Sequence, residues 1–350
     1  MGEKRYDLVT FGEAMIRLSP PDHMRLEQTN VVYMSVGGAE LNVAVNAAHL
    51  GLKTAWVSRL VDNWTGRYIL NKGRERGVEM IIYWSEFDGV GRERNGFYHV
   101  ELGAGPRAST VTYDRAYSAI SNVKPGEIDW RSILSEAKWF HTTGITPALS
   151  KSTAEVTLEA LRTACELGVK TSYDLNYRSK LWSPEEAQEV TEKLMPYVKV
   201  LFGNEEDFEK CLGLKAEGTT ESYDALDPES YKEVARKVME IYPNVELVGT
   251  TLRVAKTALL NDWRALLYDG ERFYLSRVYE NLEIVDRVGG GDSFAAGVIY
   301  CLLTGKPMEE TIEFAAAYSA LAHTFPYDFN WATLDEVERA MKGLTARIRR

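Results

Sequence analysis

The stretch DRVGGGDSFAAG, residues 286–297, places three glycines directly before an aspartate and an apolar, helix-like run. Glycine inside a regular element costs about 0.5–1 kcal/mol relative to alanine, so three in a row require a reason. The first N–H groups of a helix are unpaired and carry the positive end of its dipole, and glycine lets an anion approach them closely. The amides of Gly289, Gly290 and Gly291 are therefore predicted to bind a phosphate.

Asp292 follows this turn and suggests catalysis, because a carboxylate facing a bound phosphate would otherwise only repel it. Beside a phosphoryl group, an aspartate can act as the general base that takes the proton from an attacking hydroxyl. Two plainer interpretations stay open: Asp292 as an N-cap, where Asp is favoured, and the glycines as a tight strand-to-helix turn. The chain contains neither GxxxxGK[ST] nor a GxGxxG after its first strand, so the two common nucleotide-binding loops are excluded.

Composition and charge exclude several other classes of protein. The net charge of −10 and the pI near 5.2 oppose nucleic-acid binding, which requires basic surface. No apolar run approaches the roughly 20 residues of a membrane helix, and the start lacks a signal-type segment, so we expect a cytoplasmic protein without membrane contact. An anionic substrate would need a local cluster of cations to overcome this charge.

The reactive side chains outside the glycine turn show no recognisable pattern. The five histidines have no ligand spacing, which argues against a hydrolase or a metalloenzyme. The three cysteines, Cys165, Cys211 and Cys301, are isolated in the sequence, which argues against a disulfide framework or a zinc site. We expect all three to be buried as small apolar side chains.

Strand-like and helix-like runs alternate along most of the chain. The strands are expected at 6–12, 54–60, 138–144, 170–176, 198–204 and 281–287, and the helices at 37–51, 63–77, 150–168, from Pro184, from Glu205, and at 290–303, 308–323 and 333–342. Such alternation predicts an α/β fold with a mostly parallel central sheet between layers of helices.

One segment interrupts the alternation. Residues 88–115 hold short β-prone pieces, glycines and charges without a helical period. With residues 14–36, this segment is expected to form a small β-sheet lid on a single domain spanning 1–350; an unstructured surface insertion is the alternative. A structureless loop of this length is uncommon in a compact domain unless it covers a site, which favours the lid.

Several motifs together resemble the ribokinase-like, or pfkB-type, carbohydrate kinases. DRVGGGDSFAAG resembles the DTxGAGDxF signature of that family, GGAELNVA at 37–44 resembles GGxxxNxA, and NEED at 204–207 resembles NxxE. Each motif is weak alone, but their order and spacing match over nearly the whole chain. The resemblance implies a three-layer ribokinase-like fold and a kinase that uses ATP and Mg²⁺. GEAMIRL, YDLNYRSKLW and AHTFPYDFN most resemble the 2-keto-3-deoxygluconate kinases, which implies phosphorylation of that sugar acid at its 6-hydroxyl.

The resemblance also implies the roles of individual residues. Substrate contacts are implied for Gly37, Gly38, Asn42, Tyr113, Arg115 and Arg178, and we add Arg107 because a sugar carboxylate requires guanidinium partners. Any of these arginines could instead be a solvated surface charge, and Asn42 an ordinary polar residue of a first helical turn. Asp292 is implied as the base, with the amides of residues 289–291 as the anion hole.

The nucleotide is expected to contact Asn204, Asp207, Thr250 and Ala317, with adenine near residues 315–323 and the loop that follows. Mg²⁺ is expected to be held largely through water near Glu206 and Asp207. The same acidic run, Glu205 to Asp207, is equally typical of a first helical turn. The sequence departs from the family pattern at Arg287, Gly290 and Asp207, and VGTTLRVAKTALL lacks the glycine-rich turn of many relatives.

Three further expectations concern substrate and assembly. A kinase of the same fold for a neutral sugar, such as fructose or ribose, is the main alternative, although a neutral sugar would not need the arginines. A sensor without turnover is a second alternative, which Asp292 opposes because binding alone is better served without its charge. The lid is too small to have a core of its own, so we expect a homodimer or higher oligomer formed through it.

Overall fold

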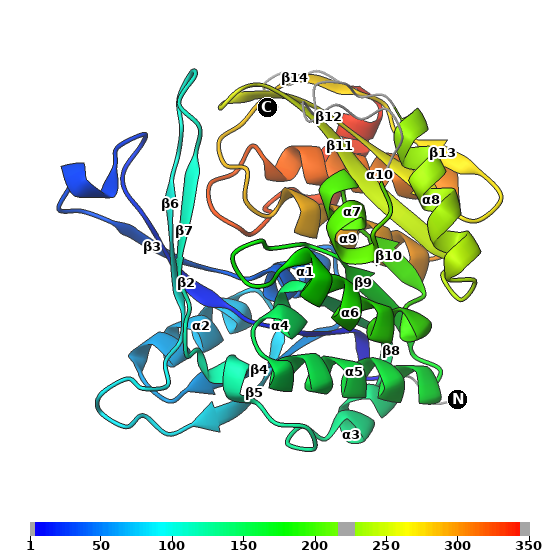
Figure 1. The fold of residues 1–350 in the computed structure, drawn as a ribbon. Helices are drawn as coiled ribbons and strands as arrows, with labels where there is room; N and C mark the ends of the chain where they lie inside the picture. Colours follow the sequence, from blue (N-terminus) through cyan, green and yellow to red (C-terminus); the bar gives the residue numbers. More distant parts are fainter. Residues whose placement is uncertain (1–3, 216–227, 344–350) are drawn as a thin grey trace.

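The computed structural model describes residues 4–215 and 228–343 and contains two sheets of different size (Figure 1). The large sheet has ten strands, in the order β13-β12-β11-β10-β9-β8-β1-β4-β5, with β14 also paired to β12. The bounds are β1 Tyr6–Phe11, β4 Thr54–Val61, β5 Glu79–Ser85, β8 Ala137–Thr143, β9 Lys170–Asp174, β10 Val200–Phe202, β11 Leu247–Thr257, β12 Leu260–Tyr268, β13 Phe273–Leu275 and β14 Tyr279–Glu283.

The part of the large sheet from β5 to β11 is parallel, whereas β12 runs antiparallel to β11, β13 and β14. Parallel strands that are covered on both faces are buried along nearly their whole length, as β1, β4 and β8 are. Because the carboxyl ends of parallel strands meet at one edge, this edge is where an open α/β sheet places its ligands.

Helices cover both faces of the large sheet. One face packs against α3 (Trp130–Ser135), α5 (Lys151–Glu166), α6 (Pro184–Leu194), α7 (Glu205–Leu212) and α8 (Glu229–Ile241), and the other against α1 (Ala39–His49), α2 (Trp64–Glu75), α9 (Gly290–Leu303), α10 (Met308–Ala322) and α11 (Leu334–Met341). The short helix α4 (Ile145–Ala148) follows β8 directly. The predicted three-layer architecture is therefore confirmed.

The small sheet consists of β3 (Tyr33–Gly37), β2 (Met15–Ser19), β6 (Phe97–Glu101) and β7 (Thr110–Asp114), in that order. Its pairs are antiparallel except for β2 with β6, which is parallel. In Figure 1 this sheet stands beside the large one and carries the long β6–β7 hairpin. The expectation of a small second sheet from two separated segments is confirmed, and the sheet is called the lid below.

Most expected elements agree with the structure to within a few residues, and the helix predicted at 290–303 coincides with α9. The strand expected at 281–287 is wrong beyond Glu283. There the chain leaves the sheet, because the amides of Val285 and Asp286 bond to the carbonyl of His323 instead of a strand. The antiparallel strands β12 and β13 and the parallel edge strand β5 were not foreseen.

The cysteines differ in their surroundings. Cys211 and Cys301 are buried, as expected, but Cys165 is exposed. It follows Ala164, the last residue of the buried stripe of α5, and so faces outward. None of the helices in the described ranges combines the length and apolarity needed to span a bilayer.

Candidate active site

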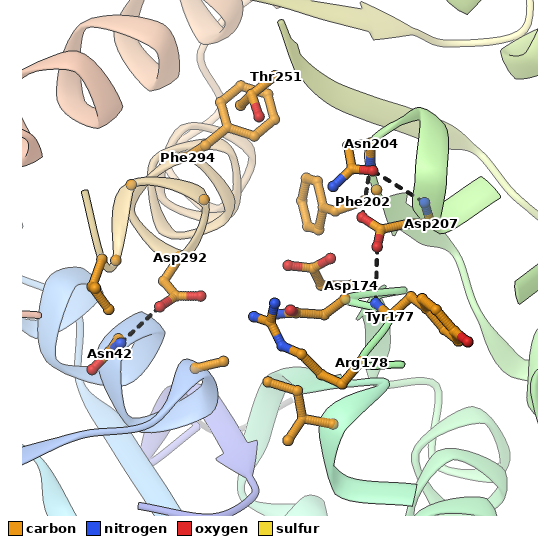
Figure 2. Close-up of a pocket in the computed structure, with 18 of the residues that line it drawn as sticks. Asn42, Asp174, Tyr177, Arg178, Phe202, Asn204, Asp207, Thr251, Asp292 and Phe294 are labelled. Atoms are coloured by element: carbon orange, nitrogen blue, oxygen red, sulfur yellow. Dashed lines mark hydrogen bonds between the residues drawn. The ribbon is translucent and has the colours of Figure 1, made fainter. Parts of the chain in front are cut away.

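A cavity of about 510 Å³ lies where the parallel strands end and the lid begins. The C-terminal ends of β9 and β10, the start of α9, the turn before α1 and the strands of the lid all contribute to its lining. Figure 2 shows Thr251 and Asn204 toward one end, Asn42 and Arg178 toward the other, and Asp174 and Asp292 between them. The chain therefore brings segments that are far apart in sequence to one site.

Glycine occupies the three positions of the turn for different structural reasons. Gly289 is the N-cap of α9 with φ 86°, and a Cβ there would lie 2.3 Å from the carbonyl oxygen of Asp328. A Cβ on Gly290 would lie 2.5 Å from Cε1 of His323. A Cβ on Gly291 would meet nothing within 4 Å beyond its chain neighbours and its own helix. Packing thus explains the first two glycines, whereas at Gly291 the absent side chain leaves the helix start open to the cavity.

Asp292 does not cap α9. It is the third residue of the helix, after the N-cap Gly289, and its Oδ2 accepts a hydrogen bond of 2.7 Å from Nδ2 of Asn42. The Oδ1 of Asn42 in turn accepts from the amide of Gly38, which orients the Asn42 side chain. Burial raises the pKa of Asp292 to about 6, against the Asn42 hydrogen bond and the charge of Arg178, which both favour the carboxylate. Asp292 is thus a fixed carboxylate with a pKa close to neutrality.

Arg178 extends into the cavity from the loop after β9, between Asp174 and Asp292 (Figure 2). It forms no ion pair or side-chain hydrogen bond with any residue in 4–215 or 228–343. Burial raises the pKa of Asp174 well above its usual range, and the charges of Asp207 and Asp292 add to this effect. We name Arg178, Asp174 and Asp292 the open cluster, because its cation is free to meet a ligand.

Arg115 and Tyr113 reach the cavity from the lid, as the sequence implied. The guanidinium of Arg115 is paired with Oε2 of Glu13, and both side chains are almost fully buried. Tyr113 stacks on Tyr98 with ring centroids 6.1 Å apart. The charge of Arg115 is therefore balanced within the chain, unlike that of Arg178.

A second arginine with two aspartates lies under the lid. Arg17 in β2 is 1% exposed, and its guanidinium nitrogens lie 2.5 Å from Oδ2 of Asp286 and 2.9 Å from Oδ2 of Asp328. The hydroxyl of Tyr98 donates to Oδ1 of Asp328 at 2.6 Å. We name these four residues the closed cluster. It ties the lid to the turn before α9 and to the loop after α10, and sequence reasoning missed it.

Asn204 and Asp207 form the capping box of α7. The Asn204 side chain accepts from the amide of Asp207, and Oδ2 of Asp207 accepts from the amide of Asn204. The other oxygen of Asp207 accepts from the amide of Tyr177, and burial raises the pKa of Asp207 to about 6. Both residues line the cavity, but the carboxylate of Asp207 is committed to backbone amides. The acidic run is thus the first turn of a helix, with Glu206 exposed at the cavity.

Two predicted site residues lie elsewhere. Arg107 is at the tip of the β6–β7 hairpin, where its Nη2 donates to the carbonyl of His23, and it does not line the cavity. Ala317 is fully buried in α10 and packs in the apolar core. Of the expected adenine region at 315–323, only His323 lines the cavity, because α10 is buried on nearly all sides. The structure therefore places neither Arg107 nor Ala317 at the cavity.

Thr250 lines the cavity as expected, together with three side chains that the sequence did not identify: Arg253, Trp263 and Arg287. For two of these residues the sequence does contain a partial indication. Arg287 stands where the family signature has Thr, and Arg253 lies in the strand that lacks the usual glycines. A departure from a motif can therefore mark a residue that lines the cavity.

Glu40 of α1 is a further cavity residue that the sequence did not identify. It is fully buried, and its Oε1 accepts from the Thr143 amide and from the hydroxyls of Thr143 and Thr146. Burial raises the pKa of Glu40 to about 7. A Cβ at Gly12 would lie 2.1 Å from this carboxyl group, so glycine is required there.

Comparison with known proteins agrees with this geometry. The family model for pfkB family carbohydrate kinases matches residues 5–326. A 2-dehydro-3-deoxygalactonokinase of Haloferax volcanii is 38% identical, over 98% of this chain and 99% of that protein. The crystal structure of the 2-dehydro-3-deoxygluconokinase of Thermotoga maritima superposes with a TM-score of 0.89 at 43% identity, covering 96% of this chain and 99% of that one.

A putative ribokinase II from E. coli, solved in complex with ATP and Mg²⁺, superposes with a TM-score of 0.76 over 97% of this chain and 99% of its own. At 18% identity this similarity shows the fold alone. The ribokinase-like fold, the glycine turn before a half-buried aspartate and the family match lead to one conclusion: the chain belongs to the pfkB family of carbohydrate kinases.

Proposed function

We propose that this kinase transfers the γ-phosphoryl group of ATP to the 6-hydroxyl of 2-keto-3-deoxygluconate. The products are 2-keto-3-deoxy-6-phosphogluconate and ADP. The observation that carries the proposal is the open cluster, in which the unpaired guanidinium of Arg178 and the carboxylate of Asp292 face the same cavity. One group suits the carboxylate of a sugar acid, and the other suits the proton of its hydroxyl.

The acid substrate follows from charge. A protein of net charge −10 repels an anionic sugar unless a fixed cation offsets that field locally. Arg178 supplies a planar donor that matches a carboxylate and has no competing partner in the described chain. Arg115 is paired with Glu13, so its remaining donors suit sugar hydroxyls better than a second carboxylate. A neutral sugar would leave the guanidinium of Arg178 without a carboxylate to accept its hydrogen bonds.

The chemistry follows from the positions of the groups around Asp292. Its carboxylate takes the proton of the 6-hydroxyl while that oxygen attacks the γ-phosphorus. The bond between the γ-phosphorus and the β,γ-bridging oxygen breaks, and that oxygen leaves on ADP. The amides of residues 289–291, at the positive end of α9, stabilise the charge on the transferring group. Asn42 holds Asp292 in place by its hydrogen bond.

The donor set at the cavity fits Mg²⁺ that is held mainly by phosphates and water. No group of three or more His, Cys, Asp or Glu side chains in the described residues forms a direct metal cage. Asp174 and Glu206 line the cavity and can accept hydrogen bonds from water bound to the ion, whereas Asp207 already accepts from two amides. When bound with ATP, Mg²⁺ supplies positive charge that neutralises the phosphate chain.

We further propose that two copies of the chain associate through their lids. Val31, Val32, Tyr33 and Met34 are between 39% and 55% exposed on and before β3, an edge strand of the lid. Such a run of exposed apolar residues on a strand edge favours pairing with another chain. Light scattering is expected to give the mass of a dimer at micromolar concentration. A monomer mass at that concentration would contradict the proposal.

The test of the proposed reaction is ADP release with Mg²⁺ATP over a panel of acceptors. The panel contains 2-keto-3-deoxygluconate, 2-keto-3-deoxygalactonate, gluconate, fructose, ribose and adenosine. We expect turnover with the keto-deoxy acids and a preference for the gluco epimer. Turnover confined to the galacto epimer would correct the substrate, and turnover on fructose or ribose would remove the acid argument. No turnover on any acceptor would favour a sensor.

A further inference from the structure

We propose that Arg253 and Arg287 bind the phosphate chain of the nucleotide, as a cationic pair beside the glycine turn. The two residues line the same cavity as Gly289, Gly290 and Gly291. This inference rests on the proposed use of ATP and extends it, because both arginines stand at positions where the sequence departs from the family pattern.

The backbone places Arg253 on one wall of the cavity. In the antiparallel pair of β11 and β12, Arg253 lies directly opposite Trp263, so their side chains share one face of the sheet. Thr251, two residues before Arg253, lies on the same face, and all three residues line the cavity. Arg287 comes from the other wall, two residues before Gly289. The two guanidinium groups thus approach the turn from different elements.

Neither guanidinium is neutralised within the described residues. Arg253 and Arg287 form no ion pair and no side-chain hydrogen bond there, and Nε of Arg287 is buried without a partner. Burial and the charge of Arg287 lower the pKa of Arg253, and no carboxylate acts on it in the opposite direction. Arg253 is exposed and Arg287 is half-buried, and two like charges that face one cavity repel each other, so an anionic ligand between them would stabilise this arrangement.

The neighbouring donors are also unsatisfied. The indole N–H of Trp263, which is 5% exposed, and the hydroxyl of Thr250, which is 3% exposed, have no hydrogen-bond partner. A buried donor without a partner costs about 1–3 kcal/mol, and several around one cavity indicate a missing acceptor. Phosphate oxygens accept several hydrogen bonds from arginine and from neutral donors at once.

His323 lies beside both Trp263 and Gly290 and does not add a third charge. Its Nδ1 donates to the carbonyl of Ser319 at 2.8 Å, and its ring packs on Trp263 with centroids 4.6 Å apart. Burial lowers the pKa of His323 to about 4, and the charges of both arginines contribute. A neutral ring here holds Trp263 and Gly290 at fixed positions, so that the charge facing the ligand comes from the arginines.

The test is calorimetric binding of ATP, ADP, AMP and adenosine to the full chain without sugar, for wild type, Arg253→Gln and Arg287→Gln. Loss of a charge-assisted contact is expected to weaken ATP binding about tenfold or more in each variant. Adenosine, which has no phosphate, should bind equally to all. The slope of ATP affinity against salt should fall as each charge is removed. Arg74→Gln is the matched control, because it removes the same charge from an exposed position outside the cavity and should leave ATP affinity unchanged.

Unchanged ATP affinity in both variants, or equal losses for ATP and adenosine, would overturn the inference. A loss confined to the KM of the sugar acid would also overturn it, because the arginines would then serve the other substrate. Thermal melting separates a structural role: removing one of two unpaired like charges should leave Tm equal or higher. Since binding is measured without sugar, the inference can hold even if the acceptor panel disproves the proposed substrate.

Discussion

The closed and open clusters each contain one arginine and two aspartates, yet they are arranged in opposite ways. In the closed cluster, Arg17 is 1% exposed and bonds both Asp286 and Asp328. In the open cluster, Arg178 faces the cavity and bonds neither Asp174 nor Asp292. A buried ion pair requires nearly complete hydrogen bonding to offset desolvation. The comparison therefore indicates that the paired arginine holds the lid, while the unpaired one is available to a substrate.

Asp292→Asn is the strongest test of the open cluster, because it removes the base and keeps the shape of the side chain. We expect kcat to fall by on the order of 10³-fold, the usual contribution of general-base catalysis. Binding of ATP and sugar should be retained. Single-turnover assays and calorimetry measure these two effects separately. A kcat near that of wild type would end the assignment of Asp292 as base.

Arg17→Met tests the closed cluster, where we expect the largest change in stability. Removing the guanidinium leaves the charges of Asp286 and Asp328 buried without a cation, which costs about 3–5 kcal/mol of unfolding free energy. Urea unfolding measures this loss. Adding Asp286→Asn and Asp328→Asn to the variant should recover part of it, because the uncompensated charges are then gone. If Arg17→Met were as stable as wild type, the two clusters would not differ as the comparison requires.

Arg178→Ala should lower activity and leave stability nearly unchanged, whereas Arg17→Met should mainly lower stability. Because Arg178 has no partner in the described chain, its removal should change the free energy of unfolding by less than about 0.5 kcal/mol. The kcat/KM for 2-keto-3-deoxygluconate should fall about 10- to 100-fold through the lost carboxylate contact. Activity with any neutral sugar accepted by the enzyme is the internal control. Equal losses on both kinds of sugar would show that Arg178 does not recognise the acid group.

The pH dependence gives the smallest effect and sharpens the role of Asp292. Its pKa is raised from 3.8 to about 6, so the base becomes protonated below that pH and kcat/KM should fall about tenfold per unit. Stability changes with pH in the opposite direction to activity. The stabilisation that comes from the raised pKa of Asp292 is fully present below pH 3.8 and is lost as the pH rises through 6. Melting curves of wild type and Asp292→Asn from pH 4 to 8 should diverge accordingly. Parallel curves would contradict the raised pKa.

The features that sequence reasoning recovered are those written in short, continuous stretches. The glycine turn, the capped helices and the residues of GGAELNVA all depend on neighbours close in the chain, so their spacing is informative. The closed cluster was missed because Arg17 is 269 residues from Asp286 and 311 from Asp328. No local pattern distinguishes such an arginine from one on the surface.

Arg107 and Ala317 lie away from the cavity for reasons that local sequence also does not contain. Arg107 was assigned to the site because it lies in the lid, but the sequence does not fix how far the β6–β7 hairpin carries its tip from the cavity. Ala317 was assigned by its position in α10, a helix that is buried on nearly all sides. The spacing of its apolar residues therefore does not identify which side faces the cavity. Arg253 and Arg287 stand in the sequence only as departures from a motif. The structure is needed to show that both line the same cavity.

The closed cluster also bears on the order in which a newly made chain can fold. Arg17 leaves the ribosome 311 residues before Asp328. Until both partner aspartates have been synthesised, burying this arginine would carry the desolvation cost without compensation, and β2 would gain nothing by taking its final place. The lid strand must therefore remain in water while the residues between Arg17 and Asp328 are made, and the cavity that it covers is completed only after Asp328 has been added.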